Sequence, residues 1–196
     1  MTALVQHELG PFTIADWHAL PAREDGSRLE LIEGNWLVTP PPSGYHQWAE
    51  KRIIAAFDRA IERAGRADEL FAVSGVGVEI STTYRSALIP DFVVLDRPPA
   101  GNTFQAANVL LIGEIWSPGN THTEQQEKFH ACERAGVPHF WSVAQDVGGP
   151  CELAAYSLDN GRYALVATAA RGQGAVRLEA APTPLSLDID IDALRL

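Results

Sequence analysis

The sequence of 196 residues has few cysteines, few basic residues and no long apolar run. Its cysteines, Cys132 and Cys151, form no Cys-x-x-Cys pair, so neither a disulfide framework nor a cysteine zinc site is indicated. No run approaches the roughly 18 consecutive apolar residues of a membrane span, and residues 1–8 lack the basic start and apolar stretch of a secretory signal. We therefore expect a cytoplasmic protein with no membrane partner.

Acidic residues outnumber basic ones, 25 to 15, which gives a formal net charge of -10. This balance argues against a stand-alone DNA binder, because non-specific DNA affinity comes mainly from Lys and Arg that neutralise phosphates. It does not exclude a nuclease, since a metal site is itself built from acids and a local basic rim can coexist with an acidic body. The length and the hydrophobic content of 46% predict a single domain over residues 1–196 with a substantial core.

Apolar spacing and capping residues predict helices and strands in mixed order. Helices are expected over residues 14–20, over 43–64, and from Thr121 or Thr123 to residue 135. Strands are expected at residues 70–74, 76–80, 88–95, 109–116 and 139–143. Two hairpins are expected, one over residues 29–38 with Gly34 and Asn35 in the turn, the other over 152–167 with its turn at 159–161. This order describes an α/β (α+β) fold, a mixed β-sheet flanked by helices with additional β-hairpins.

Two of the expected strands each carry one carboxylate among apolar residues, Asp91 and Glu114. Desolvating an unpaired carboxylate costs several kcal/mol or more, so these acids require a cation, either a metal ion or a basic side chain. If the two strands are neighbours, about 4.8 Å apart, the carboxylates can converge on one hard cation. Mg²⁺ suits such a site, because it is commonly held by one or two protein carboxylates plus waters and phosphate oxygens.

Lys128 is the candidate basic group, because its helix follows the Glu114 strand after a tight turn at residues 117–120. Glu30, another acid between apolar neighbours, could add a carboxylate or hold a metal-bound water. Plainer interpretations stay open. Glu124 and Lys128 have the i,i+4 spacing of a surface ion pair worth about 0.2–0.5 kcal/mol, Glu30 could face solvent, and Asp91 and Glu114 could bond backbone amides.

Several further segments occur in a fixed order along the chain. They are Leu29-Glu30-Leu31-Ile32-Glu33-Gly34, Pro41-Pro42-Ser43 with His46-Gln47, Ile89-Pro90-Asp91-Phe92-Val93-Val94, Glu114-Ile115-Trp116-Ser117-Pro118, Glu127-Lys128, Ala135-Gly136-Val137-Pro138 with Phe140-Trp141, and Pro184-Leu185-Ser186-Leu187. In these segments the sequence resembles the Uma-type restriction endonucleases, a family of the PD-(D/E)XK restriction-endonuclease-like superfamily. The alternatives for His46, a phosphate contact or surface capping at the start of the long helix, stay open.

The resemblance implies a restriction-endonuclease-like core and a Mg²⁺-dependent (or Mn²⁺-dependent) endonuclease that hydrolyses phosphodiester bonds, with DNA as the partner. It implies that Asp91 and Glu114 bind the metal, with the backbone carbonyl of Ile115 as a further ligand, and that Glu30 is a supporting acid. The superfamily pattern has a lysine two residues after the second acid, where this chain has Trp116. Uma-type sequences bring a lysine from the following helix instead, which here is Lys128.

A different class of function is also consistent with the sequence: a catalytically silent domain that keeps the nuclease fold and serves as a binding or assembly module. Its motivation is the net charge of -10, the tryptophan at the place of the superfamily lysine, and the lack of a separate DNA-reading domain. The apolar content and the two-strand cuts of many nucleases of this fold also suggest a homodimer.

Overall fold

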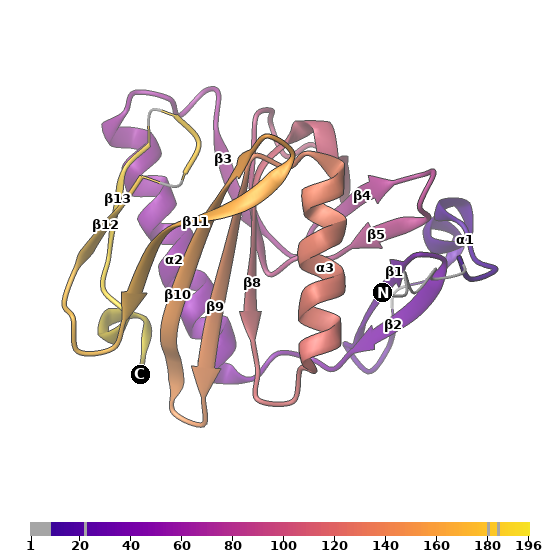
Figure 1. The fold of residues 1–196 in the computed structure, drawn as a ribbon, viewed down its shortest axis with the longest axis horizontal. Coiled ribbons are helices and arrows are strands. Elements are labelled where there is room, and N and C mark those ends of the chain that lie inside the picture. The colour runs from indigo at the N-terminus through magenta and orange to yellow at the C-terminus, as the bar shows by residue number, and fades with distance from the viewer. Residues whose placement is uncertain (1–8, 22, 180, 184) are drawn as a thin grey trace, which may run out of the picture.

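The computed structural model describes residues 9–21, 23–179, 181–183 and 185–196. Residues 1–8, on which the expectation about a secretory signal depends, and Pro184 of the last matched segment lie outside this range. The largest sheet has six strands in the order β11-β10-β9-β8-β6-β3 (Figure 1). Their bounds are β3 Phe71–Ser74, β6 Phe92–Leu95, β8 Val109–Trp116, β9 His139–Asp146, β10 Gly149–Asp159 and β11 Arg162–Ala170. Only β8 and β9 run parallel among these neighbours, so the predicted mixed sheet is confirmed.

Helices α2 (Gly44–Arg63) and α3 (His122–Ala135) cover opposite faces of this sheet. Ser43 caps α2 and Thr121 caps α3, each accepting a hydrogen bond from the backbone N–H three residues on. Successive strand residues alternate between the two faces: on β6, Phe92 packs on the α2 side and Val93 on the α3 side. Among the described residues, no helix combines the length and the apolar character needed to cross a bilayer.

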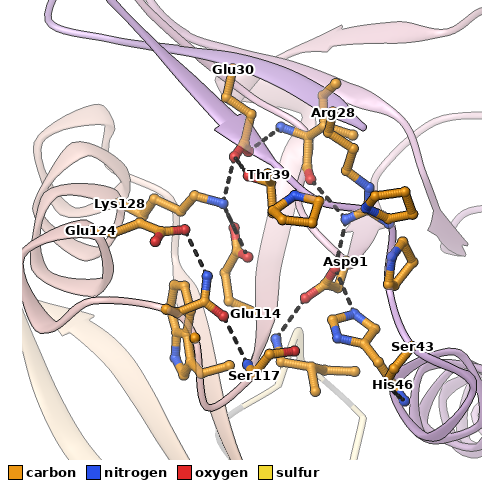
Figure 2. Close-up of a pocket in the computed structure, with 18 of the residues that line it drawn as sticks. Arg28, Glu30, Thr39, Ser43, His46, Asp91, Glu114, Ser117, Glu124 and Lys128 are labelled. Carbon is orange, nitrogen blue, oxygen red and sulfur yellow. Dashed lines mark hydrogen bonds and ion pairs between the residues drawn. The ribbon is translucent and has the colours of Figure 1, made fainter. Parts of the chain in front are cut away.

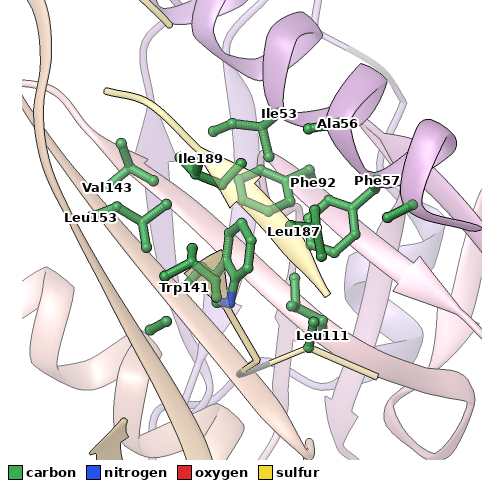
Figure 3. Packing of buried hydrophobic residues seen from close by; sticks show 14 of the residues in the cluster. Ile53, Ala56, Phe57, Phe92, Leu111, Trp141, Val143, Leu153, Leu187 and Ile189 are labelled. Carbon is green, nitrogen blue, oxygen red and sulfur yellow. The ribbon is translucent and has the colours of Figure 1, made fainter. Parts of the chain in front are cut away.

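The core on the α2 side joins the helix to the C-terminal part of the chain. Figure 3 shows Phe57 of α2 close to Phe92 and Trp141, and the ring centroids of Phe57 and Trp141 are 4.9 Å apart. Strands β12 (Val176–Leu178) and β13 (Leu187–Ile189) close this core from the side. This short hairpin was not predicted, because three-residue strands carry almost no periodicity.

A second sheet, in the order β2-β1-β5-β4-β7, packs on the α3 side. Its strands are β1 Arg28–Ile32, β2 Asn35–Thr39, β4 Gly77–Ser81, β5 Ser86–Leu88 and β7 Thr103–Gln105. Helix α1 (Ile14–Ala19) begins after Thr13 and packs on Leu31 and Ala87 of this sheet. Short 3₁₀ turns lie at Ala106–Asn108 and Asp192–Leu194.

The predicted strand over residues 88–95 is wrong in one respect, because the chain changes sheets within it. Residues up to Leu88 belong to β5 in the smaller sheet, and the chain enters the larger sheet at Phe92. Pro90 lies between them, and a proline has no N–H to continue a ladder of hydrogen bonds. Asp91 is therefore not inside a strand but at the crossover where the two sheets meet.

The first hairpin turn also differs by one residue from the prediction. Ile32 pairs with Asn35, so the turn consists of Glu33 and Gly34, with φ of 48° and 76°. A two-residue turn with positive φ at both positions matches the twist of a hairpin, and Asn35 takes a strand position instead. At the second hairpin, Asn160 and Gly161 form the turn within the predicted residues.

Gly113→Ala is expected to destabilise the protein, because a Cβ at this position of β8 would overlap the ring of Phe92. The overlap would force the ring or the strand to move, at a cost of about 1–3 kcal/mol in the free energy of unfolding. Gly44→Ala is the matched control, since nothing lies within 4 Å of its added Cβ. Urea unfolding measures both, and equal midpoints for Gly113→Ala and the wild type would contradict the packing described.

Candidate active site

A cavity of about 340 Å³ opens where the two sheets and the two long helices meet. Figure 2 shows that its polar side chains come from distant parts of the sequence and point toward one another. All five residues predicted for the site line this cavity: Glu30, Asp91, Glu114, Ile115 and Lys128. The structure therefore brings together the whole predicted set.

Asp91 lies next to Glu114 because β6 and β8 are antiparallel neighbours. Phe92 pairs with Gly113, so continuing this register by one residue places Asp91 opposite Glu114. Oδ2 of Asp91 accepts a hydrogen bond of 2.7 Å from the backbone N–H of Ile115. In an antiparallel pair, the N–H and C=O of one residue face the same neighbouring strand, so the Ile115 carbonyl is directed to the side of Asp91. The side chain of Ile115 packs in the core.

Lys128 of α3 joins Glu114 to Glu30 of β1. Its Nζ lies 2.7 Å from Oε2 of Glu30 and 3.4 Å from both carboxylate oxygens of Glu114. The other oxygen of Glu30 accepts a hydrogen bond of 2.7 Å from the backbone N–H of Ile89, next to the crossover. All three charged side chains are buried, so the interpretation of Glu30 as solvent-facing is wrong.

The interpretation of Lys128 as half of a surface ion pair is also wrong. The residue is 3% exposed, and Glu124 accepts a hydrogen bond of 2.8 Å from the side chain of Asn120. The ring centroid of Trp116 lies 5.8 Å from Nζ of Lys128, within the range of a cation–π interaction. The tryptophan thus forms part of the wall around the lysine.

Arg28 is a site residue that sequence reasoning missed. Its Nη1 lies 2.6 Å from Oδ1 of Asp91, and its Nη2 lies 4.0 Å from Oε2 of Glu50. Arg28 and Glu30 are two residues apart on β1, so they share one face of the strand. The alternation of side chains along a strand could have identified Arg28, because Glu30 was already a predicted site residue.

Glu50 was not predicted as a site residue, and His46 was left open between a phosphate contact and surface capping; the burial of His46 makes the surface interpretation wrong. His46 is buried, its Nε2 lies 2.9 Å from Oδ1 of Asp91, and Glu50 follows one turn later on α2. Of the described residues, His46, Glu50 and Asp91 make the one group of three or more His, Cys, Asp or Glu whose ligand atoms all lie within 4.8 Å of one another. The sequence does contain a signal for these two residues. They begin, with polar side chains, the same helix face that continues with the buried residues Ile53 and Phe57.

Burial and neighbouring charges shift the pKa values of the charged side chains in the site. Burial, together with the nearby Asp91 and Glu30, raises the pKa of Glu114 well above its usual range in spite of the attraction of Lys128. Burial disfavours the charged form of Lys128, but Glu114 and Glu30 outweigh it and raise the pKa of the ammonium group. Burial also opposes ionisation of Asp91, and His46, Arg28 and the Ile115 N–H outweigh it and lower the pKa.

The surplus of carboxyl groups over basic groups fits a divalent cation, which favours their ionised form. The carboxylates are Glu30, Glu50, Asp91 and Glu114, whereas the permanently basic groups are Arg28 and Lys128. The site thus has more carboxyl groups than permanently basic side chains to pair with them. Carboxylate and backbone carbonyl oxygens are the ligands that Mg²⁺ takes in proteins.

The fold is shared with a solved protein. The crystal structure of "a putative nuclease belonging to DUF820" from Anabaena variabilis superimposes with a TM-score of 0.70, over 94% of this chain and 97% of that chain. The two sequences are 20% identical, so the likeness shows the fold. The mixed α/β fold predicted from the sequence is therefore also the fold of that protein.

The family follows from the sequence match. The model of the Uma2 family, described as "Putative restriction endonuclease", matches residues 14–190. The chain therefore belongs to the Uma2 family, and the predicted resemblance is confirmed. No curated protein matches the chain.

Proposed function

We propose that this protein is a metal-dependent endonuclease that hydrolyses phosphodiester bonds of DNA with Mg²⁺ or Mn²⁺. The observation that carries the proposal is a buried excess of carboxyl groups over basic side chains at an open cavity, with a lysine beside them. Asp91, Glu114 and Lys128 are each at most 4% exposed, yet they line a cavity of about 340 Å³. Membership of the Uma2 family supports a nuclease-like activity.

Asp91, Glu114 and the carbonyl of Ile115 would hold the metal, which when bound would supply Lewis acidity and lower the pKa of a bound water. Lys128 would position the attacking water or stabilise the charge that develops on the phosphorus centre, since its Nζ already faces the Glu114 carboxylate at 3.4 Å. Glu30 would be a positioning residue. Its oxygens contact the Lys128 ammonium and the Ile89 amide, so it fixes the lysine relative to the crossover that presents Asp91.

The proposal is tested by incubating the purified full chain with supercoiled plasmid and with DNA and RNA oligonucleotides. Cleavage is expected with Mg²⁺ or Mn²⁺ and is expected to stop when EDTA removes the metal, because the lysine alone cannot offset the charge of the transition state. Ca²⁺ serves as a control for an ion that binds oxygen ligands with looser geometry. Cleavage that continues undiminished in EDTA would contradict the proposal.

A second function, a catalytically silent binding or assembly module, has its own support. The acids of the site already have internal basic partners, with Arg28 2.6 Å from Asp91 and Lys128 2.7 Å from Glu30. Calorimetric titration with Mg²⁺ and Mn²⁺ separates the two functions. No binding at millimolar metal would favour the silent module, whereas binding that disappears in Asp91→Ala would favour the enzyme. The homodimer stays a prediction under either function.

A further inference from the structure

A second cavity, of about 270 Å³, adjoins the candidate active site, and Trp116 lines both. It lies between α3 and the strands β8, β9 and β10. Four aromatic side chains line it: Trp116 of β8, Phe140 of β9, Tyr156 of β10 and Phe129 of α3. We call it the aromatic cavity. The proposed reaction makes no use of it, although one of its walls is also a wall of the active site.

The rings of the aromatic cavity are held in fixed planes. The centroid of Phe129 lies 5.2 Å from that of Phe140 and 5.0 Å from that of Tyr156, with interplanar angles of 81° and 77°. The indole N–H of Trp116 donates a hydrogen bond of 2.8 Å to Oγ of Ser142. Edge-to-face packing of this kind is favourable in itself, so the rings are ordered before any ligand arrives. Phe129 and Tyr156 are only partly buried, which leaves ring surface for a ligand.

The polar groups around these rings are amides and imidazoles. Among the described residues, no aspartate, glutamate, lysine or arginine lines the aromatic cavity. Gln125 and Gln126 of α3 do, and within the same part of the chain their side-chain amides have no hydrogen-bond partner. An amide offers a donor and an acceptor side by side, the pattern that pairs with the edge of a nucleobase. A flat, uncharged ring with donors and acceptors along its edge therefore matches this lining.

One short turn separates the two cavities. Residues 117–120 connect Trp116 to the start of α3, and Ser117, Gly119 and Asn120 line the candidate active site. His122, in the first turn of α3, already lines the aromatic cavity. The sequence of the turn, Ser-Pro-Gly-Asn, has no charged side chain. A phosphodiester chain can therefore cross it from one cavity to the other without meeting a carboxylate on the turn itself.

We propose that the aromatic cavity binds one unstacked nucleobase of the nucleic-acid strand that enters the active site. This inference rests on the proposed function, which supplies the strand. The base stacks on the rings of Phe129 and Tyr156, and the amides of Gln125 and Gln126 bind its edge. A base inside a duplex is stacked on both sides, so the occupant belongs to a single strand or is extruded from a duplex.

Photochemical crosslinking of the full chain tests the proposal without relying on cleavage. DNA oligonucleotides that have 5-iodouracil at one position, moved stepwise along the strand, are bound in Ca²⁺ and irradiated. A crosslink to Phe129, Tyr156 or Trp116 is expected from one position or two adjacent positions, and mass spectrometry identifies the residue. Crosslinks from the single strand alone would identify a single-stranded occupant, and crosslinks from the duplex as well would identify an extruded base. No crosslink to these rings from any position, in either form, overturns the proposal.

Phe129→Leu is expected to weaken binding of the crosslinking oligonucleotide by about fivefold or more, because leucine has no ring on which a base can stack. Fluorescence anisotropy in Ca²⁺ measures the affinity. The matched control is Phe12→Leu, whose ring lies 4.9 Å from that of Trp36 and lines neither cavity. Equal affinities for Phe129→Leu and the wild type would contradict the proposal.

Gln126→Glu decides the question if Phe129→Leu does not fold. Gln126 is exposed, and a carboxylate in its place removes the amide donor and repels the strand, so binding should again weaken by about fivefold or more. Gln105→Glu makes the same change of charge at an exposed residue outside both cavities and should bind as the wild type does. Binding that is as strong in Gln126→Glu as in Gln105→Glu would overturn the proposal.

Cleavage assays on the same oligonucleotides keep the two proposals separate. Cleavage in Mg²⁺ without a crosslink in the aromatic cavity would remove the base site and leave the proposed function. A crosslink to Phe129 without cleavage in Mg²⁺ or Mn²⁺ would do the reverse.

Discussion

Asp91→Asn is expected to lower the rate of DNA cleavage by about 10³-fold or more, since it removes the carboxylate charge that Arg28 and His46 contact and that would bind the metal. The amide keeps the shape of the side chain, and its oxygen can still accept the hydrogen bond from Ile115. It loses the charge that attracts Arg28 and, in our proposal, the metal. Single-turnover cleavage of supercoiled plasmid at saturating Mn²⁺ measures the effect, and calorimetry should show weaker metal binding in the same variant.

Asp96→Asn is the matched control for this experiment. Asp91 immediately precedes β6 and Asp96 immediately follows it, but Asp96 is exposed and does not line the cavity. The control is expected to cleave at the wild-type rate. If Asp91→Asn also cleaves at that rate while its circular dichroism spectrum matches the wild type, Asp91 has no part in the reaction.

The predicted site residues were accessible from the sequence because their signal is local. Asp91 and Glu114 each interrupt an apolar run, and burial of both runs forces the carboxylates out of water whatever the rest of the fold does. Lys128 could be predicted because the turn after β8 is short, so α3 returns along the sheet and brings the lysine near Glu114. The resemblance to the Uma-type family then selected these positions among the acids of the chain.

The rest of the site depends on contacts that no local pattern encodes. Arg28 and His46 reach the same oxygen of Asp91 from β1 and from α2, and their meeting requires both sheets and the helix to be packed. The crossover at Pro90 was misjudged for a related reason. Residues 88–95 are almost uniformly apolar. An apolar pattern predicts that both ends of this segment are buried, but it does not indicate that the two ends belong to different sheets.

Lys128→Met is expected to destabilise the protein by about 3–5 kcal/mol, because it removes one partner of a buried ion pair. The methionine fills a similar volume, but Glu30 and Glu114 then face each other without the ammonium between them. Urea unfolding at neutral pH with EDTA present measures the change in the free energy of unfolding. The matched control is Lys51→Met, which replaces an exposed lysine of α2 and should change stability by no more than about 0.5 kcal/mol.

The double variant Glu30→Gln with Lys128→Met separates the structural role of the lysine from its chemical one. Removing the charge of Glu30 as well leaves Glu114 without that like-charged neighbour, so stability should recover by at least about 1 kcal/mol relative to Lys128→Met alone. Cleavage should not recover, because the ammonium that faces Glu114 is still absent. A double variant that regains both stability and cleavage would show that Lys128 serves only to hold Glu30. A Lys128→Met protein as stable as the wild type would mean that the buried pair does not form.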